Sequence, residues 1–520
     1  MSQVISPMAS SVLSRQLGLR SLTLAVVTST IGSGWLFAPF YAARSAGPAA
    51  LGAWLLGGGL AFSLALVFAE LGSLVNSSGA LAQIPLLSHG RTAGFIGGWS
   101  AWIAYLALPT IEVLAVLQYL ASSVPWITVA ASSNGGGAGQ VLSAPGLALA
   151  IALLALLAWI NLAGVDWLAR WIDGLTAWKL AVPLLISITL MLTAGHWGNL
   201  AASPQPPAQS LQGMVTAISS GGILFSLLGF RTAMDLAGET RQPQRTVPLA
   251  MALGLAISLA IYVILQLAFL VSVPPEQLVG GWSTLRLTAH GGPLVALAMG
   301  LGLGWVARLL LLDAVVSPSA TAMAYLGASA RVSWMMGRCG LLPGSFGRLN
   351  RQAVPSVALL FSLGMGVLML LSGPSWQTVV SFLTATLVIA LAMGPVSLIS
   401  LRRQLPDAPR AYRLPQARLW CNSAFVLATW AISWCGTSSL RGACLIVLVP
   451  AAVFAMTDRQ QLRQGLWWFL YLGGLVAITA LALELPIELT ALAAWALLVF
   501  PLATGSRLAQ AHPGAQWQPL

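Results

Sequence analysis

Charged residues are scarce in this chain. Of its 520 residues, 7% are charged and 58% are hydrophobic, whereas an average soluble domain has about 25% charged residues. Lysine is almost absent, because the 24 basic residues comprise 23 arginines and the single lysine Lys179. A chain of this composition needs lipid as its solvent, so the sequence predicts a membrane protein and excludes a soluble one.

Metal-binding, disulfide and catalytic motifs are also missing. The four cysteines form neither a C-x-x-C pair nor a cluster with histidine, which is typical of small apolar residues rather than of a metal site or a disulfide framework. The sequence has no H-E-x-x-H, no Walker motif and no evident nucleophile triad. We therefore expect no enzyme activity, no cofactor and no metal, and the short gaps between apolar runs leave no room for a soluble domain.

The long apolar runs predict an all-α polytopic membrane protein of about 14 helices. Each run is close to or above the roughly 20 residues that a helix needs to cross a hydrocarbon core of about 30 Å. The first run resembles a signal peptide in following two arginines, but its length and the spans behind it favour a retained helix. The expected spans are residues 22–43, 49–75, 95–124, 147–163, 167–193, 214–236, 247–273, 295–327, 357–372, 379–401, 420–434, 443–456, 466–483 and 487–502.

The arginines indicate how these helices are oriented. Eighteen arginines fall in segments on one side of the membrane, and only Arg44, Arg286 and Arg441 fall on the other. Arginine and lysine concentrate on the cytoplasmic side of membrane proteins. We therefore expect a multi-pass protein of the cell inner membrane with both termini in the cytoplasm. Because the arginines are spread over short loops, the net charge of +12 does not indicate nucleic acid as a partner.

Two of the expected spans contain residues that interrupt a helix. The first carries Ile31-Gly32-Ser33-Gly34, and the sixth carries Ser219-Ser220-Gly221-Gly222 and then Gly229. Glycine also permits close packing of membrane helices, which is the alternative explanation for either stretch alone. The two spans are five apart, however, and an odd offset gives the second set of helices the inverted topology of a transporter repeat. Matching breaks in the two halves predict a substrate site between them.

A broken helix offers both kinds of charge that a zwitterion needs. The N–H groups at the start of its second half carry partial positive charge, and the carbonyls at the end of its first half carry partial negative charge. We expect the amides near Ser33 and Gly34 to bind a carboxylate. We expect the carbonyls near Phe225, Ser226 and Leu227 to bind an ammonium group.

Three stretches resemble the amino acid-polyamine-organocation permeases, a family of membrane transporters. The resemblance covers most of the first ten spans and is most specific in the second stretch. The three stretches are Ile31-Gly32-Ser33-Gly34; Phe225-Ser226-Leu227-Leu228-Gly229-Phe230 running on to Gly238-Glu239-Thr240-Arg241-Gln242-Pro243-Gln244-Arg245-Thr246-Val247-Pro248; and residues 330–355 with Gly340-Leu341-Leu342-Pro343.

The resemblance implies a LeuT-type fold of two inverted five-helix repeats, roughly residues 20–193 and 212–402. These repeats would form a transporter core at 1–405, with four additional helices in 406–520. The resemblance also makes Phe225 an aromatic gate over a bound amino acid, for which an ordinary core phenylalanine is the alternative. The substrate-binding residues expected from the broken spans and from the resemblance together are Ile31, Gly32, Ser33, Gly34, Phe225, Ser226, Leu227, Gly229 and Arg231.

Lys179 is the candidate for proton coupling. It lies about 13 residues into the fifth span, roughly 20 Å deep, and an ionisable group at that depth is a functional candidate by default. In proton-coupled members of the family, a lysine in the fifth span stands in for a sodium ion between the first and eighth spans, and Lys179 matches that place. The alternative is a permanent structural cation that binds carbonyls of the broken helix.

Arg231 departs from the family pattern, in which an acidic or neutral residue often follows the Gly-Phe pair. Its guanidinium could form a bidentate pair with an anionic substrate side chain. The motif Gly229-Phe230-Arg231 resembles the bacterial aspartate-proton symporter branch of the family. The alternative partner is Asp235, which lies four residues on and on the same helical face.

Further charges lie in or near the expected spans at Glu112, Arg308, Asp313 and Glu239. Arg308 and Asp313 are five residues apart, so each is expected to have a partner elsewhere. Asp313 precedes Ser317-Pro318-Ser319-Ala320-Thr321, whose hydroxyls suit either an ion site or, as we prefer, a proline kink. Glu239 and the arginines that follow it could close an inner gate or pair at the surface.

Together these features predict a secondary active symporter that takes up an amino acid, with acidic substrates favoured, together with a proton. Its expected partners are the amino acid, the proton and the lipid bilayer, and the sequence does not indicate an oligomeric state. An amino acid exchanger on the same fold is the first alternative. A membrane sensor that binds an amino acid without transporting it is a weaker one.

Overall fold

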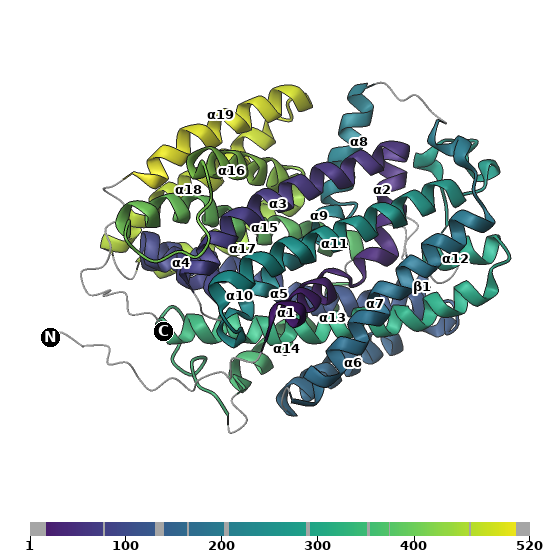
Figure 1. The fold of residues 1–520 in the computed structure, drawn as a ribbon, viewed down its shortest axis with the longest axis horizontal. Coiled ribbons are helices and arrows are strands. Elements are labelled where there is room, and N and C mark those ends of the chain that lie inside the picture. Colours follow the sequence, from purple (N-terminus) through teal and green to yellow (C-terminus); the bar gives the residue numbers. More distant parts are fainter. Residues whose placement is uncertain are drawn as a thin grey trace.

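The computed structural model describes residues 17–75, 79–130, 140–163, 166–201, 207–287, 292–350, 354–373, 375–456 and 459–505. Long helices lie side by side through most of this part of the chain (Figure 1). The one sheet within it is a hairpin of β1 (Thr128–Ala130) and β2 (Gln140–Leu142). Helices dominate because a backbone in lipid must satisfy its hydrogen bonds within its own segment.

The elements follow the order that the apolar runs predict. The first half contains α1 (Leu19–Thr30), α2 (Gly34–Ala46), α3 (Ala50–Leu74), α4 (Ala80–His89), α5 (Arg91–Leu120), α6 (Ala144–Ala163) and α7 (Asp166–Thr193). The second contains α8 (Pro207–Ser219), α9 (Ile223–Leu227), the 3-10 turn η4 (Leu228–Arg231), α10 (Thr232–Asp235), α11 (Pro243–Ser272), α12 (Pro293–Gly300), α13 (Gly304–Arg338), α14 (Ser356–Leu371) and α15 (Trp376–Gln404). Four helices follow: α16 (Ala417–Ser433), α17 (Thr437–Met456), α18 (Arg459–Ala480) and α19 (Leu485–Thr504).

Among the described residues, nine helical stretches are long and apolar enough to cross a membrane, or ten if the bent pair of α8 with α9 and α10 is one span. This count treats α2 and α3 as one continuous stretch, and α14 and part of α18 are shorter apolar helices. The prediction of an all-α multi-pass membrane protein is confirmed. The predicted number of 14 spans is approximate.

Corresponding helices of the two predicted repeats pack against each other. Helix α3 packs against α11, α5 against α13, and α6 against α14, so the second, third and fourth spans each contact the span five positions later. The two broken spans also meet, because α1 contacts η4 and α2 contacts α8 and α9. This pairwise packing is the arrangement that two inverted repeats produce.

The predicted eighth span, residues 295–327, is wrong in its boundaries. The structure has two helices there, the short α12 and the long α13, separated by a turn in which Gly302 has a φ of +73°. Glycine adopts this left-handed conformation without steric cost, so the helix ends at the turn. Arg308, which the sequence placed inside a span with a partner elsewhere, therefore lies near the start of α13, and its side chain is exposed.

The last four helices lie outside the core formed by α3, α5 and α15. Helix α16 packs against α3 and α15, and α17 and α18 pack against α5, on the side away from α6 (Figure 1). The segment before α16 is fixed by Glu70 of α3, which is fully buried. Glu70 accepts hydrogen bonds from Arg402 at 2.9 and 2.5 Å and from the Leu414 amide at 2.8 Å, and it forms an ion pair with Arg410.

Candidate functional site

The first span is broken where the sequence predicts. Helix α1 ends at Thr30, residues 31–33 are not helical, and α2 begins at Gly34. The carbonyls that the break leaves without helical partners bind side chains of three other helices. Lys179 Nζ donates to the Thr28 carbonyl at 2.8 Å, and the hydroxyls of Tyr325 and Tyr262 donate to the carbonyls of Ser29 and Thr30 at 3.1 and 2.9 Å.

The break in the sixth span begins earlier than Phe225. Helix α8 ends at Ser219, and the chain bends by 51° before α9. Gly222 has a φ of +90° at this bend, a conformation that favours glycine. Phe225 to Gly229 then form one helical turn and the start of η4, so part of this stretch has its carbonyls paired: the Phe225 carbonyl accepts the Leu228 amide.

The two breaks pack directly against each other, and two glycines permit this. A Cβ at Gly34 would overlap the side chain of Ser226, and a Cβ at Gly229 would overlap Thr30, whose backbone nitrogen it would meet at 2.8 Å. Both glycines are therefore needed for close approach, as the packing interpretation of the sequence proposed. Packing and substrate binding are not exclusive here, because the contact brings the two breaks to one place.

Lys179 lies between the first and eighth spans. Its ammonium group is fully buried and donates to Thr321 Oγ1 of α13 at 2.7 Å as well as to Thr28. The Thr321 hydroxyl also reaches the carbonyls of Thr28 and Ile31, at 3.3 and 3.4 Å. Lys179 thus binds the carbonyl end of the broken helix. Both of its interpretations, proton coupling and permanent structural cation, require this position.

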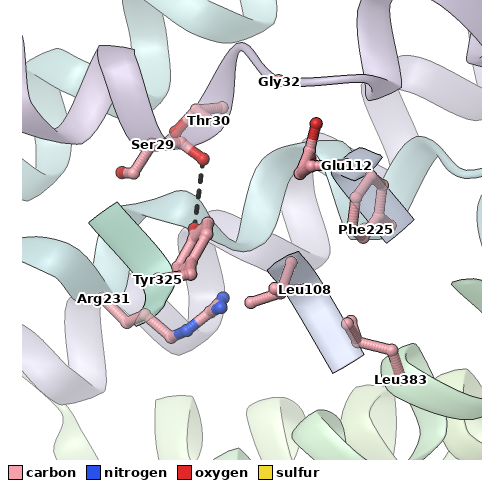
Figure 2. A pocket seen from close by; sticks show the side chains of 9 residues that line it. All are labelled: Ser29, Thr30, Gly32, Leu108, Glu112, Phe225, Arg231, Tyr325 and Leu383. Atoms are coloured by element: carbon pink, nitrogen blue, oxygen red, sulfur yellow. Dashed lines mark hydrogen bonds between the residues drawn. The ribbon is translucent and has the colours of Figure 1, made fainter. Parts of the chain in front are cut away.

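A small cavity lies between the two breaks (Figure 2). Three of the predicted site residues, Gly32, Phe225 and Arg231, line it, and the others do not. The cavity has room for about one water molecule, so an amino acid can enter only if a lining side chain moves. The lining residues are Ser29, Thr30, Gly32, Leu108, Glu112, Phe225, Arg231, Tyr325 and Leu383.

Glu112 of α5 occupies the amide end of the first break. Its carboxyl group is buried, and Oε2 accepts a hydrogen bond from the Ser33 amide at 2.7 Å. A Cβ at Gly32 would lie 2.6 Å from Glu112 Oε1, so the carboxyl group rests on the unwound backbone. The amide at which we expected a substrate carboxylate is thus bound to a carboxyl group of the protein. The signal in the sequence was an acidic residue in the middle of the third span, which is costly without a function.

Arg231 lies in the cavity without an acidic partner. No ion pair joins it to Asp235 in the described part of the chain, so the predicted alternative of an i,i+4 pair is wrong. Its guanidinium carbon lies 4.7 and 5.1 Å from the ring centres of Tyr105 and Tyr325. Nη1 donates to the Leu228 carbonyl at 2.5 Å, whereas the buried Nε and Nη2 have no hydrogen-bond partner.

Two aromatic side chains, Phe225 and Trp376, lie together beside the first break. Phe225 lies edge-on to Trp376, with 5.9 Å between the ring centres, and the Trp376 indole donates to Ser33 Oγ at 3.2 Å.

Asp313 has partners elsewhere, as predicted: its carboxylate accepts from the Trp178 indole at 2.6 Å and from the Trp35 indole at 3.1 Å. Ser317, whose hydroxyl suited either an ion site or the preferred proline kink, donates to Asp313.

An ion pair lies at the end of α13 away from α12. Glu239 pairs with Arg331 of α13 at 3.1 Å, rather than with the arginines that follow it in the sequence. The backbone of Leu17 bridges the same segment, since its amide donates to the Glu239 carbonyl and its carbonyl accepts from the Arg241 amide. The start of the first span and the end of the sixth are thereby joined to the eighth.

Comparison with known proteins places this architecture in one family. The family model for amino acid permeases matches residues 17–478. The chain is 30% identical to the glutamate/serine transporter AimA of Bacillus subtilis over 90% of this chain and 88% of that protein. It is also 30% identical to the aspartate-proton symporter of Bacillus subtilis, over 88% of each chain.

A solved structure shows the same fold. A mutant manganese transporter of Eremococcus coleocola superposes with a TM-score of 0.54, covering 96% of this chain and 98% of that one at 14% identity. Identity this low supports the fold and nothing about the substrate. The chain therefore belongs to the amino acid permease family and has the LeuT-type fold that its resemblance to this family implies.

Proposed function

We propose that this protein is a secondary active transporter that takes up an amino acid together with a proton, and that acidic amino acids such as aspartate are its preferred substrates. The relatives described as an aspartate-proton symporter and a glutamate/serine transporter support this substrate class. We also propose that residues 1–405 are the transporting core, because α16 to α19 pack on its outside.

The observation that carries the acidic preference is the unpaired guanidinium of Arg231. It lines the cavity with two buried donors that have no partner. Buried guanidinium donors without hydrogen-bond partners are unfavourable, and a carboxylate that binds them through two parallel hydrogen bonds relieves this cost. Such a carboxylate would be the side chain of the substrate, because the acidic neighbour Asp235 forms no ion pair with Arg231.

The α-carboxylate of the substrate would bind at the first break. The Ser33 amide already holds a carboxylate, that of Glu112, at 2.7 Å. This contact supports the proposal that the unwound backbone can bind a carboxyl group of a substrate. The substrate would displace Glu112, and the movement would create the space that the cavity lacks. Phe225 would then cover the bound amino acid.

Lys179 would carry the transported proton. Its two hydrogen bonds join α1 to α13, the first span to the eighth. Loss of a proton from the ammonium group weakens both bonds and lets the two spans separate, so protonation would control their relative movement. The distribution of arginines supports an orientation with both termini in the cytoplasm and a place in the inner membrane.

Uptake into liposomes tests the proposal. Purified protein is reconstituted with no amino acid inside, a pH gradient is imposed with the acidic side outside, and labelled L-aspartate is added. A gradient of about one pH unit corresponds to about 1.4 kcal/mol, so coupling to one proton should give up to about tenfold accumulation. Collapse of the gradient with a protonophore should abolish accumulation.

Two results would contradict the proposal. Uptake that occurs only into liposomes preloaded with amino acid would make the protein an exchanger. An absence of flux for aspartate, glutamate and neutral amino acids alike would refute transport of these substrates.

The acidic preference is tested by Arg231→Gln, which should weaken aspartate uptake by about tenfold or more relative to serine uptake, because the lost hydrogen bonds involve charged groups. Equal losses for both substrates would remove Arg231 from side-chain recognition.

A further inference from the structure

Arg231 and Asp235 have the spacing of an ion pair but do not form one. They are four residues apart in the sixth span, and both are buried. Oppositely charged residues at this spacing commonly pair on a helix. Each of them keeps unpartnered atoms instead: Nε and Nη2 of Arg231 and Oδ1 of Asp235. Arg231 ends the 3-10 turn η4 and does not lie in one α-helix with Asp235, so spacing alone does not bring the two charges together, and the other partners of each side chain decide where it lies.

Tyr105 of α5 contacts both members of the pair. Its hydroxyl donates to Asp235 Oδ2 at 2.7 Å, and its ring centre lies 4.7 Å from the guanidinium carbon of Arg231. The ring attracts the cation through its face, and the hydroxyl attracts the anion. One side chain from the third span thus supplies a separate partner to each of the two charges.

We propose that Tyr105 and Asp235 are positioning residues that set the substrate preference: Tyr105 holds Asp235 away from Arg231, so that the guanidinium stays available for the acidic side chain of a substrate. This inference rests on the proposed role of Arg231 and adds the reason why the arginine is free. Removal of the Tyr105 hydroxyl releases Asp235, which then pairs with Arg231 and leaves no charge for the substrate.

The test is a cycle of variants in reconstituted full-length protein. The ratio of kcat/KM for L-aspartate to that for L-serine is measured for the wild type, Tyr105→Phe, Asp235→Asn and the double variant. Tyr105→Phe should lower the ratio by about tenfold or more, since it removes a charged partner from the substrate. The double variant should return the ratio to within about threefold of wild type, because no competing carboxylate remains. A merely structural role of Tyr105 gives no such rescue.

Tyr325→Phe is the matched control. The Tyr325 ring also lies over Arg231, but its hydroxyl donates to the Ser29 carbonyl and not to Asp235. Removing this hydroxyl should change uptake of aspartate and serine alike and leave their ratio near that of the wild type. A fall in the ratio as large as that in Tyr105→Phe would overturn the inference.

Arg231→Gln separates failure of the inference from failure of the proposed function. If Arg231→Gln abolishes the preference for aspartate and Tyr105→Phe does not, the inference is wrong and the proposed function stands. If Arg231→Gln leaves the preference unchanged, the inference and the proposed role of Arg231 both fail, whereas proton-coupled uptake of acidic amino acids still stands. Equal loss of uptake of the two substrates in Tyr105→Phe, without rescue in the double variant, would make Tyr105 structural and also overturn the inference.

Discussion

Replacement of Lys179 distinguishes a transported proton from a permanent structural cation. The ammonium group makes two hydrogen bonds, to Thr28 at 2.8 Å and to Thr321 at 2.7 Å. A hydrogen bond from a charged donor contributes about 1.5–3 kcal/mol, so the protonated lysine stabilises the contact between α1 and α13 by about 3–6 kcal/mol. A neutral donor retains about 0.5–1.5 kcal/mol for each bond. The change of protonation therefore alters the contact by several kcal/mol, which is enough to shift a two-state equilibrium about a hundredfold.

Two variants test this reasoning. Lys179→Gln removes the charge, whereas Lys179→Arg keeps a charge that never leaves at ordinary pH. If the lysine carries the proton, both variants should fail to accumulate aspartate under a pH gradient. Both should still exchange internal for external aspartate, because exchange needs binding but no net proton movement. Accumulation is followed as uptake of labelled aspartate into liposomes, and exchange as counterflow in preloaded liposomes.

The arginine variant gives the sharper result. Wild-type accumulation by Lys179→Arg would show that a fixed positive charge is sufficient, and Lys179 would then be a structural cation. Wild-type accumulation by Lys179→Gln would show that the charge is not needed at all. Either result would refute proton coupling through this residue.

Three further predictions concern glutamate side chains. Glu112→Gln should strengthen binding of aspartate about fivefold in an equilibrium binding assay, because the neutral glutamine side chain competes less than glutamate with the substrate carboxylate for the Ser33 backbone N–H. Unchanged or weaker binding would show that Glu112 and the substrate do not compete. Glu239→Gln removes the ion pair with Arg331, which is worth up to about 1 kcal/mol, and should speed hydrogen exchange of the Leu17 and Arg241 amides about fivefold. Unchanged exchange would show that the ion pair does not stabilise the backbone contact between Leu17 and this segment. Glu70→Gln leaves Arg402 and Arg410 without their carboxylate and should destabilise the protein by about 3–5 kcal/mol, seen as a Tm lowered by several degrees; a Tm equal to that of the wild type would contradict this.

The sequence predicts the features that a lipid environment requires, namely the helices and the first break. Apolar length locates the helices, and the glycines at 32 and 34 locate the first break, because an interrupted backbone in a membrane needs special residues. The second break could be located only to within a few residues. Gly221-Gly222 and Gly229 are both compatible with an interruption, and the structure places the bend at Gly222. The turn at Gly302 was missed because the apolar composition continues through it.

Partners across the membrane domain could not be predicted in the same way. The pair of Arg231 and Asp235 is the natural expectation from spacing along one helix. It fails because Tyr105, from a span more than a hundred residues earlier, takes the carboxylate. The same applies to Glu112, whose position in the third span was visible but whose contact with Ser33 was not. Local spacing identifies charges that need partners, and only the packing of distant spans determines which partners they find.

The contacts of the first break suggest why it can serve as the moving part of a transporter. Its carbonyl end binds Lys179 of α7, Tyr262 of α11 and Tyr325 of α13, and its amide end binds Glu112 of α5. Four helices thus hold one short segment through hydrogen bonds rather than through apolar packing alone. Hydrogen bonds of this kind can be exchanged for bonds to a substrate or altered by a proton, whereas close packing resists change. In the proposed mechanism, a substrate at the amide end and a proton at the carbonyl end would act on the same segment, which is the physical requirement for coupling their transport.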